Sequence, residues 1–195
     1  MKASTIALLT VAGLIVFGFL TVSWYISAGN GLIALNESVN SSWSQVESVY
    51  QRRADLIPNL VNTVKGYAKH EADVLESITQ ARASVGQIRV NSPDDLKKFE
   101  GAQNQLSSSL SRLMMISEKY PDLKADKNFM ELQSQLEGTE NRITIERQRF
   151  NETARVYNTA IRQFPGSFIA GNKGLKERAY FASKAGAENA PEVKF

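Results

Sequence analysis

The sequence predicts an all-α protein, in which an N-terminal transmembrane helix is followed by an elongated antiparallel bundle of three to four long helices and an irregular C-terminal strap. The chain opens with a long apolar stretch, and apolar residues then recur at spacings of three and four over most of the remaining sequence. No stretch alternates as a half-buried strand would. We therefore expect a membrane anchor at residues 1–28 and a helical bundle domain at residues 29–195, with its tail at 165–195.

The anchor is the clearest local signal. From Ile6 to Ile26 the chain carries no charge, and at ~1.5 Å per residue this stretch is long enough to cross a hydrocarbon core of ~30 Å. Aromatic residues at its end suit the membrane interface. We expect lipid contact along the stretch, and the predicted anchor residues are Ile6, Leu14, Phe19, Trp24, Tyr25 and Ile26.

A cleaved signal peptide is the alternative, but it would have a shorter apolar region and small residues at both cleavage positions. The sequence Ile26-Ser27-Ala28 provides only the second. A retained anchor is therefore favoured. Lys2 precedes the span whereas Glu37 and Glu47 follow it, which favours an N-terminus in the cytoplasm and a body outside it.

The first bundle helix is expected after a short hinge at residues 27–31. Its apolar stripe passes through Arg53 and Glu71, so two ionisable groups lie on or beside the packed face. The stripe consists of Leu32, Leu35, Val39, Trp43, Val46, Tyr50, Ile57, Leu60, Val64, Tyr67, Val74 and Ile78.

Pro58 decides whether this helix is continuous. Proline removes one helical hydrogen bond and crowds the carbonyl of Ala54, so the helix must either kink or break. In a break, Asp55 would cap a new helix; in either case Asn59 and Asn62 could satisfy freed backbone groups. Bundles of three and of four helices therefore both fit the pattern.

Two further helices follow. Ser92, Pro93 and the carboxylates at 94 and 95 form a helix start, and Pro121 ends the apolar seam that follows. The last helix should run from about residue 127 to 164, with Gly138 as its weakest point. The glycine-rich tail is expected to be irregular and to pack along the bundle as a strap, or else to bind a partner. Its candidate contacts are Phe168, Tyr180, Phe181 and Phe195.

Several kinds of chemistry are absent from the sequence. It has one histidine and no cysteine, and although His70-Glu71 begins like a zinc-protease motif, Val74 stands where the second histidine would be. No serine-hydrolase elbow, phosphate loop or dinucleotide fingerprint is present. The net charge of +3 is small and interspersed, which argues against nucleic acid as a partner. We predict no enzymatic activity, no metal and no cofactor.

The polar segment from Arg52 to Glu71 is the candidate structural or interaction motif. Its first residues could form a solvated helix face, but the place of Arg53 in the stripe favours a guanidinium that lies along the core or fixes helix register. His70 is expected at the boundary rather than as a ligand or a pH switch. A hydrolase using Asp55 and His70 is disfavoured because an unbroken helix would separate them by ~22 Å. The motif residues are Arg52, Arg53, Asp55, Pro58, Asn59, His70 and Glu71.

This segment closely resembles the signature of the LemA family of bacterial membrane proteins, together with Asn36 and Trp43. The similarity continues at Ala154–Asn158, Phe164-Pro165, Tyr180-Phe181 and Pro191–Phe195. The resemblance implies a membrane anchor and an antiparallel helical bundle in a bacterial inner membrane, with no catalytic residue or cofactor to carry over. It suggests, as partners, a membrane protein with a TPM domain or a membrane metalloprotease.

We expect a non-enzymatic, membrane-anchored scaffold that forms a homo-oligomer and organises or recruits other cell-envelope proteins. A narrow bundle encloses little volume for a substrate, and apolar residues such as Met114, Met115 and Phe168 would favour contact between subunits. The alternative is a monomeric adapter that regulates a membrane protease or a signalling partner.

Overall fold

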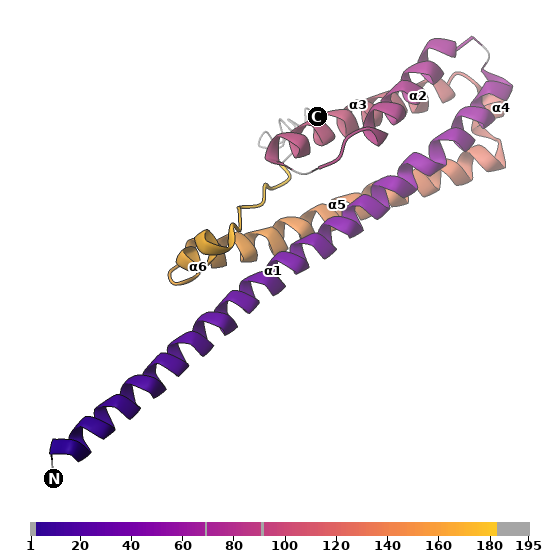
Figure 1. The fold of residues 1–195 in the computed structure, drawn as a ribbon. Helices are drawn as coiled ribbons and strands as arrows, with labels where there is room; N and C mark the ends of the chain where they lie inside the picture. The colour runs from indigo at the N-terminus through magenta and orange to yellow at the C-terminus, as the bar shows by residue number, and fades with distance from the viewer. Residues whose placement is uncertain (1–2, 69, 91, 183–195) are drawn as a thin grey trace, which may run out of the picture. The chain divides into compact units, whose positions relative to one another are not determined.

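The computed structural model describes residues 3–68, 70–90 and 92–182, and all regular secondary structure in these ranges is helical (Figure 1). The all-α prediction is therefore confirmed. The helices are α1 (Ala3–Tyr67), α2 (Ala72–Gly86), α3 (Pro93–Ser117), α4 (Pro121–Lys124), α5 (Lys127–Arg162) and α6 (Gly166–Lys173).

Helix α1 differs from the expected first helix at both ends. It runs unbroken through residues 27–31 and through Pro58, so the predicted hinge is wrong, and Pro58 does not end a helix. Isolated glycines are tolerated inside a helix at a cost of only ~1 kcal/mol each. The predicted stripe to Ile78 is instead interrupted after Tyr67, and α2 begins at Ala72. The described chain therefore has four longer helices, α1, α2, α3 and α5, because the predicted first helix is divided after Tyr67.

The described chain forms two compact units. Unit 1 consists of the residues up to Ser41 together with Glu152–Arg178, and unit 2 consists of Ser42–Asn151 together with the residues from Ala179 onward. Helices α1 and α5 each contribute residues to both units.

Unit 2 contains the packed helices of the body. Helix α2 packs against α3 (Figure 1), and the short connection between them makes the two antiparallel. Contacts pair position 53 of α1 with position 140 of α5, and position 67 with position 126 just before α5, so this part of α1 is antiparallel to α5. The largest side chains buried in unit 2 include Ile57, Leu60, Ile78, Leu106, Leu113, Leu123 and Phe129.

An aromatic cluster fills one end of the core of unit 2. Trp43 meets Phe99 and Phe150 edge to face, with ring centroids 5.8 Å and 5.5 Å apart. Phe181, from the segment after α6, stacks on Trp43 at 5.9 Å. Aromatic pairs in such geometries add ~0.5–1.5 kcal/mol to the burial of their surfaces, so this tail residue is part of the core.

Two helix starts in unit 2 are capped as their sequences dictate. The Ser92 hydroxyl accepts a hydrogen bond from the backbone N–H of Asp95 at 3.2 Å, which confirms the predicted start of α3. Asp126 caps α5 in the same way, since its Oδ1 accepts from the backbone N–H of Phe129 at 2.9 Å. Gly138 lies inside α5 without interrupting it.

Unit 1 holds a helix that the sequence did not predict. Residues 166–173 form α6 within the tail expected to be irregular, because Ile169 packs against α1 at Gly29 and Ala170 is also buried. Eight residues are too few to stand alone as a helix in water, so only tertiary packing makes this segment helical. Gly174 ends it in the left-handed conformation, with φ of 66°.

Beyond α6 the chain has no regular secondary structure from residue 175 to residue 182. In unit 1 the side-chain amide of Asn158 pairs with the backbone of Arg178, and in unit 2 that of Asn151 pairs with the backbone of Phe181. The tail thus follows α5 as a strap over its described residues. The predicted contact Phe195 and the similarity at Pro191–Phe195 lie outside the described residues.

Candidate functional site: a buried arginine cluster and an apolar groove

The two arginines that begin the polar segment face opposite ways. Arg52 is exposed, whereas Arg53 is only 3% exposed. Arg53 donates to Glu140 at 2.8 Å and to the Ser107 hydroxyl at 3.1 Å, and it also donates to the side-chain oxygen of Gln103. This one guanidinium therefore joins α1 to both α3 and α5 and fixes their register in unit 2.

Burial dominates the electrostatics of this cluster. Loss of water lowers the pKa of Arg53, and the neighbouring Glu140 opposes that change, so the guanidinium stays charged. Its carbon lies 5.2 Å from the ring centroid of Tyr50, whose own pKa is raised, chiefly by burial. An always-charged group held by three acceptors is suited to structure rather than to proton transfer.

The cluster is not fully satisfied. Arg53 Nε and Gln103 Nε2 are buried and make no hydrogen bond to the described residues. Each unpaired buried donor costs on the order of 1–3 kcal/mol. The polar centre thus gives up stability at the point where it fixes the register of three helices.

A side chain from α2 allows α1 to continue through Pro58. Because proline has no N–H, it leaves the carbonyl oxygen of Ala54 without its helical donor. Arg82 of α2 supplies the missing bond, since its Nε donates to Ala54 O at 2.8 Å. A residue 24 positions beyond the proline therefore allows α1 to continue, and nothing in the local pattern singles it out.

The other predicted motif residues lie apart from Arg53. Asp55 is exposed and accepts from Gln51 at 2.8 Å, and Asn59 and His70 are also exposed. Glu71 accepts from the Tyr120 hydroxyl at 3.1 Å, and this bond is the main cause of the raised pKa of Tyr120.

From Asp55 to its end at Tyr67, α1 rises ~18 Å. His70 follows only three residues later and cannot reach back over that distance. The approach of Asp55 to His70 that a hydrolase would need therefore does not form.

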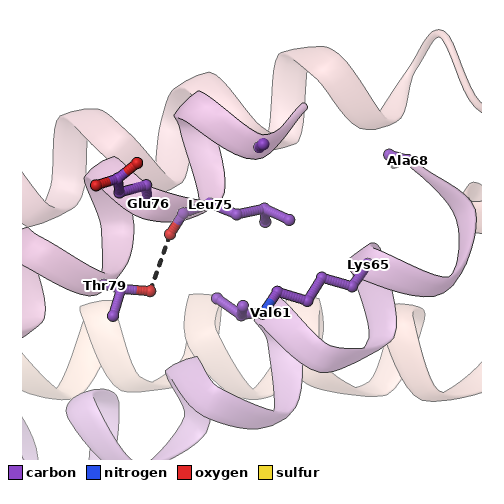
Figure 2. A pocket seen from close by; sticks show the side chains of 7 residues that line it. Val61, Lys65, Ala68, Leu75, Glu76 and Thr79 are labelled. Carbon is purple, nitrogen blue, oxygen red and sulfur yellow. Dashed lines mark hydrogen bonds between the residues drawn. The ribbon is translucent and has the colours of Figure 1, made fainter. Parts of the chain in front are cut away.

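An apolar groove lies at the turn between α1 and α2. It has a volume of about 530 Å³ and is lined by Val61, Lys65, Ala68, Ala72, Leu75, Glu76 and Thr79. Figure 2 shows Leu75 projecting from α2 toward Val61 and Lys65 on α1. The Thr79 hydroxyl is bound to the carbonyl of Leu75 at 2.9 Å, so it is not available as a directional donor to a ligand.

The groove follows from the interruption between α1, which ends at Tyr67, and α2, which begins at Ala72. Small residues on either side of the turn, Ala68 and Ala72, leave the space unfilled, and Lys65 and Glu76 place one charge of each sign on the groove wall. The sequence pattern did not predict this groove, because the apolar stripe appears continuous from Val64 to Val74. Gly66, a weak helix former beside the end of α1, was the available signal.

Within residues 3–68, 70–90 and 92–182, no three His, Asp or Glu side chains lie close enough together to hold a metal ion. One described helix is long and apolar enough to cross a membrane, and the side chains of its apolar window are not buried.

The fold and this site define a membrane-associated helical protein whose described residues include one candidate membrane-spanning helix and an interior polar cluster. The chain belongs to the LemA family, whose model matches residues 42–195. The match begins after the apolar segment and covers all of the polar segment, the groove and the strap.

The chain is also similar to named proteins, among them two magnetosome proteins and a protein LemA. The magnetosome protein MamQ of Magnetospirillum gryphiswaldense is 26% identical over 176 residues, which cover 80% of this chain and 65% of MamQ. The magnetosome protein MamQ 2 of Paramagnetospirillum magneticum is 24% identical with the same coverage. Protein LemA of Metamycoplasma hominis is 27% identical over 159 residues, 80% of this chain and 70% of that protein. The match thus spans less than two thirds of each of these two MamQ proteins.

Proposed function

We propose that this protein is a non-enzymatic, membrane-anchored helical scaffold that self-associates and recruits other proteins of the cell envelope. The main support is that the polar segment and the residues beside it contain two different features. The side chain of Arg53 is engaged in contacts within unit 2, whereas an open apolar groove lies between the end of α1 and the start of α2. A reaction centre would need accessible ionisable groups. The segment instead offers an apolar surface that suits binding.

The chemistry of the groove suits the apolar face of a helix. Such a face binds through side chains spaced at three and four residues that enter a hydrophobic groove. Val61 and Leu75 supply the apolar contact, and Lys65 and Glu76 can orient an approaching helix by charge. In the proposed scaffold this helix comes from a second copy of the chain.

The proposed location is the inner membrane of a bacterium, with one span and a periplasmic body. The charge asymmetry around residues 6–26 supports this orientation, since Lys2 precedes the span and Glu37 and Glu47 follow it. We propose TPM-domain membrane proteins or membrane metalloproteases as recruited partners, on the basis of the family resemblance alone.

The mass of the full-length protein in detergent, measured by light scattering over a range of concentrations, tests the scaffold. A discrete oligomer is expected, and Ala72→Trp should lower its mass because indole would fill the groove. Ala83→Trp is the matched control, since Ala83 is also exposed on α2 but does not line the groove. A monomer at every concentration would rule out self-association.

The adapter alternative is favoured by the same groove if the protein proves monomeric. In that case Ala72→Trp should abolish partner capture, whereas Ala83→Trp should not. A charge-reversal variant that tests partner binding should be made at the exposed Arg52. The same change at Arg53 would place a carboxylate beside Glu140 at a buried position and would disturb the fold.

A further inference from the structure

Lys173, at the end of α6 in unit 1, is a cation without a protein counter-charge. The sequence of α6, GSFIAGNK, contains no other charge, and the lysine is exposed. No carboxylate of residues 3–68, 70–90 and 92–182 is paired with it. On α1 no charged residue occurs from Ala3 to Asn36. The ammonium of Lys173 is therefore the only charge that α6 and this part of α1 carry.

The side chain of Lys173 lies on the backbone of α1 at Gly29. A Cβ added to Gly29 would lie 2.7 Å from Lys173 Cε and 3.5 Å from its Nζ. Because glycine has no Cβ, the lysine can approach the helix this closely. Figure 1 shows α6 beside α1. This contact sets the position of the ammonium along α1.

That position is less than one helical turn beyond the apolar segment. From Ile26 to Gly29 α1 rises ~4.5 Å, and the polar layer of a bilayer extends ~5–8 Å beyond the hydrocarbon core. If the core ends near Ile26, the ammonium of Lys173 stands in the layer that holds the lipid phosphates. Glu37, the first acidic residue of α1, lies ~12 Å beyond Gly29, and so it is outside this layer.

Two neutral polar side chains join the same contact between α6 and α1. Asn172 Nδ2 donates to the Tyr25 hydroxyl at 3.4 Å, which connects the end of α6 to the end of the apolar segment. The Tyr25 oxygen accepts this bond, so its O–H proton can be donated to a further acceptor. Tyrosine is enriched at membrane interfaces, where its hydroxyl reaches the headgroups. A lysine with polar donors nearby suits the charged oxygens of a phosphate.

We propose that Lys173, together with Asn172 and Tyr25, binds the phosphate of an anionic phospholipid on the side of the membrane that holds the body. The bound headgroup would link α6 to α1 at the point where α1 leaves the bilayer. The inference rests on the proposed membrane anchoring by α1 and is independent of self-association through the groove.

The test is native mass spectrometry of the full-length protein released from nanodiscs that contain equal amounts of phosphatidylcholine and phosphatidylglycerol. The proportion of the two lipids that stay bound is compared among variants. Lys173→Met removes the cation, whereas Lys173→Arg keeps it. Lys119→Met is the matched control, because Lys119 is also exposed but lies in unit 2.

Gly29→Ala changes the position of the cation and keeps its charge. The added methyl group would meet the flexible end of Lys173 and displace it, while alanine is a better helix former than glycine. A loss of lipid preference in this variant would therefore report on the geometry of the site rather than on the stability of α1.

The natural protein, Lys173→Arg and Lys119→Met are expected to retain phosphatidylglycerol in several-fold excess over phosphatidylcholine. Lys173→Met should retain the two lipids equally, and Gly29→Ala should give an intermediate proportion. An unchanged preference in Lys173→Met, or an equal loss in Lys119→Met, would overturn the proposal.

Two further outcomes separate the sources of the phosphate and the proposals from each other. If excess inorganic phosphate displaces the bound phosphatidylglycerol from the natural protein, the site takes free phosphate and the lipid assignment is overturned. If the full-length protein does not enter the nanodiscs, the anchoring by α1 fails and the lipid site fails with it. Entry without a lipid preference overturns the site alone.

Discussion

The side chain of Asn158 binds both backbone polar groups of Arg178. Asn158 Nδ2 donates to the carbonyl oxygen of Arg178 at 2.8 Å, and Asn158 Oδ1 accepts from its N–H at 2.9 Å. The Arg178 side chain in turn donates to Asn36 and Asn40 of α1, at 3.0 Å and 2.8 Å. Arg178 therefore connects the strap to α1 and to α5 within unit 1, although no local sequence pattern indicated this role.

Substituting Asn158 should loosen the strap in unit 1. Asn158 is 1% exposed, so Asn158→Ala would leave the backbone groups of Arg178 without partners, at a cost of about 1–3 kcal/mol. The measurement is the midpoint of chemical unfolding together with hydrogen exchange at the Arg178 amide. Asn158→Asp is the control, since it keeps an acceptor for the Arg178 N–H but loses the donor to the Arg178 carbonyl. An unchanged exchange rate at the Arg178 amide in Asn158→Ala would contradict the role of Asn158 in holding the strap.

The arginine cluster should be replaceable by apolar residues. Arg53→Met alone is expected to destabilise unit 2 by about 1–3 kcal/mol, because it leaves the buried Gln103 oxygen without its donor. Adding Gln103→Leu should restore wild-type stability or exceed it, since both unpaired buried donors are then removed. Urea unfolding of the three proteins decides this, and a double variant weaker than the single one would refute it.

The bond from Arg82 to Ala54 can be isolated by a double-mutant cycle with Pro58. Arg82→Met should cost about 1–3 kcal/mol in the natural background, because it leaves the Ala54 carbonyl without a donor. In a Pro58→Ala background the restored N–H can bond that carbonyl, so the same substitution should cost less. Equal costs in both backgrounds would show that Arg82 acts by other contacts.

Two glycines of α6 should respond in opposite directions. A Cβ at Gly166 would overlap the backbone carbonyl oxygen of Ala160, so Gly166→Ala should destabilise unit 1 by about 1–3 kcal/mol. Gly171 has open space around its Cβ position, and Gly171→Ala should stabilise by about 0.5–1 kcal/mol through its helix propensity. Thermal unfolding of the two variants provides the comparison, and a neutral Gly166→Ala would contradict the close approach.

Asp126 should make stability depend on acid pH. The N–H of Phe129, followed by the Tyr67 hydroxyl, lowers the pKa of Asp126 in the folded state. A lowered folded-state pKa contributes stability that is present above the unfolded pKa of about 3.9 and is lost as pH falls through the folded value. The melting midpoint of the natural protein should therefore approach that of Asp126→Asn as pH falls from 5 to below 3, whereas parallel curves would count against the cap.

Local patterns in the sequence determined the elements. These local patterns are the uncharged apolar residues from Ile6 to Ile26, the three-and-four spacing of the stripes and the Ser92–Pro93 start. They depend on neighbours within a few turns, and they predicted α3 and α5 closely and the helical character of α1, but not its continuity through residues 27–31 or its end at Tyr67. The same periodicity also indicates which side chains face the core. It therefore placed Arg53 on the packed face as one of two possibilities, and Arg53 is buried.

Tertiary structure alone decided the features that depend on distant residues. The sequence could not show that Arg82 would complete the helix at Pro58, that α6 would fold against Gly29, or that Asn158 would hold Arg178. A short helix, an orphaned carbonyl and an extended strap are each unfavourable in isolation. They are stabilised by partners that only the packed chain brings within hydrogen-bond or van der Waals distance.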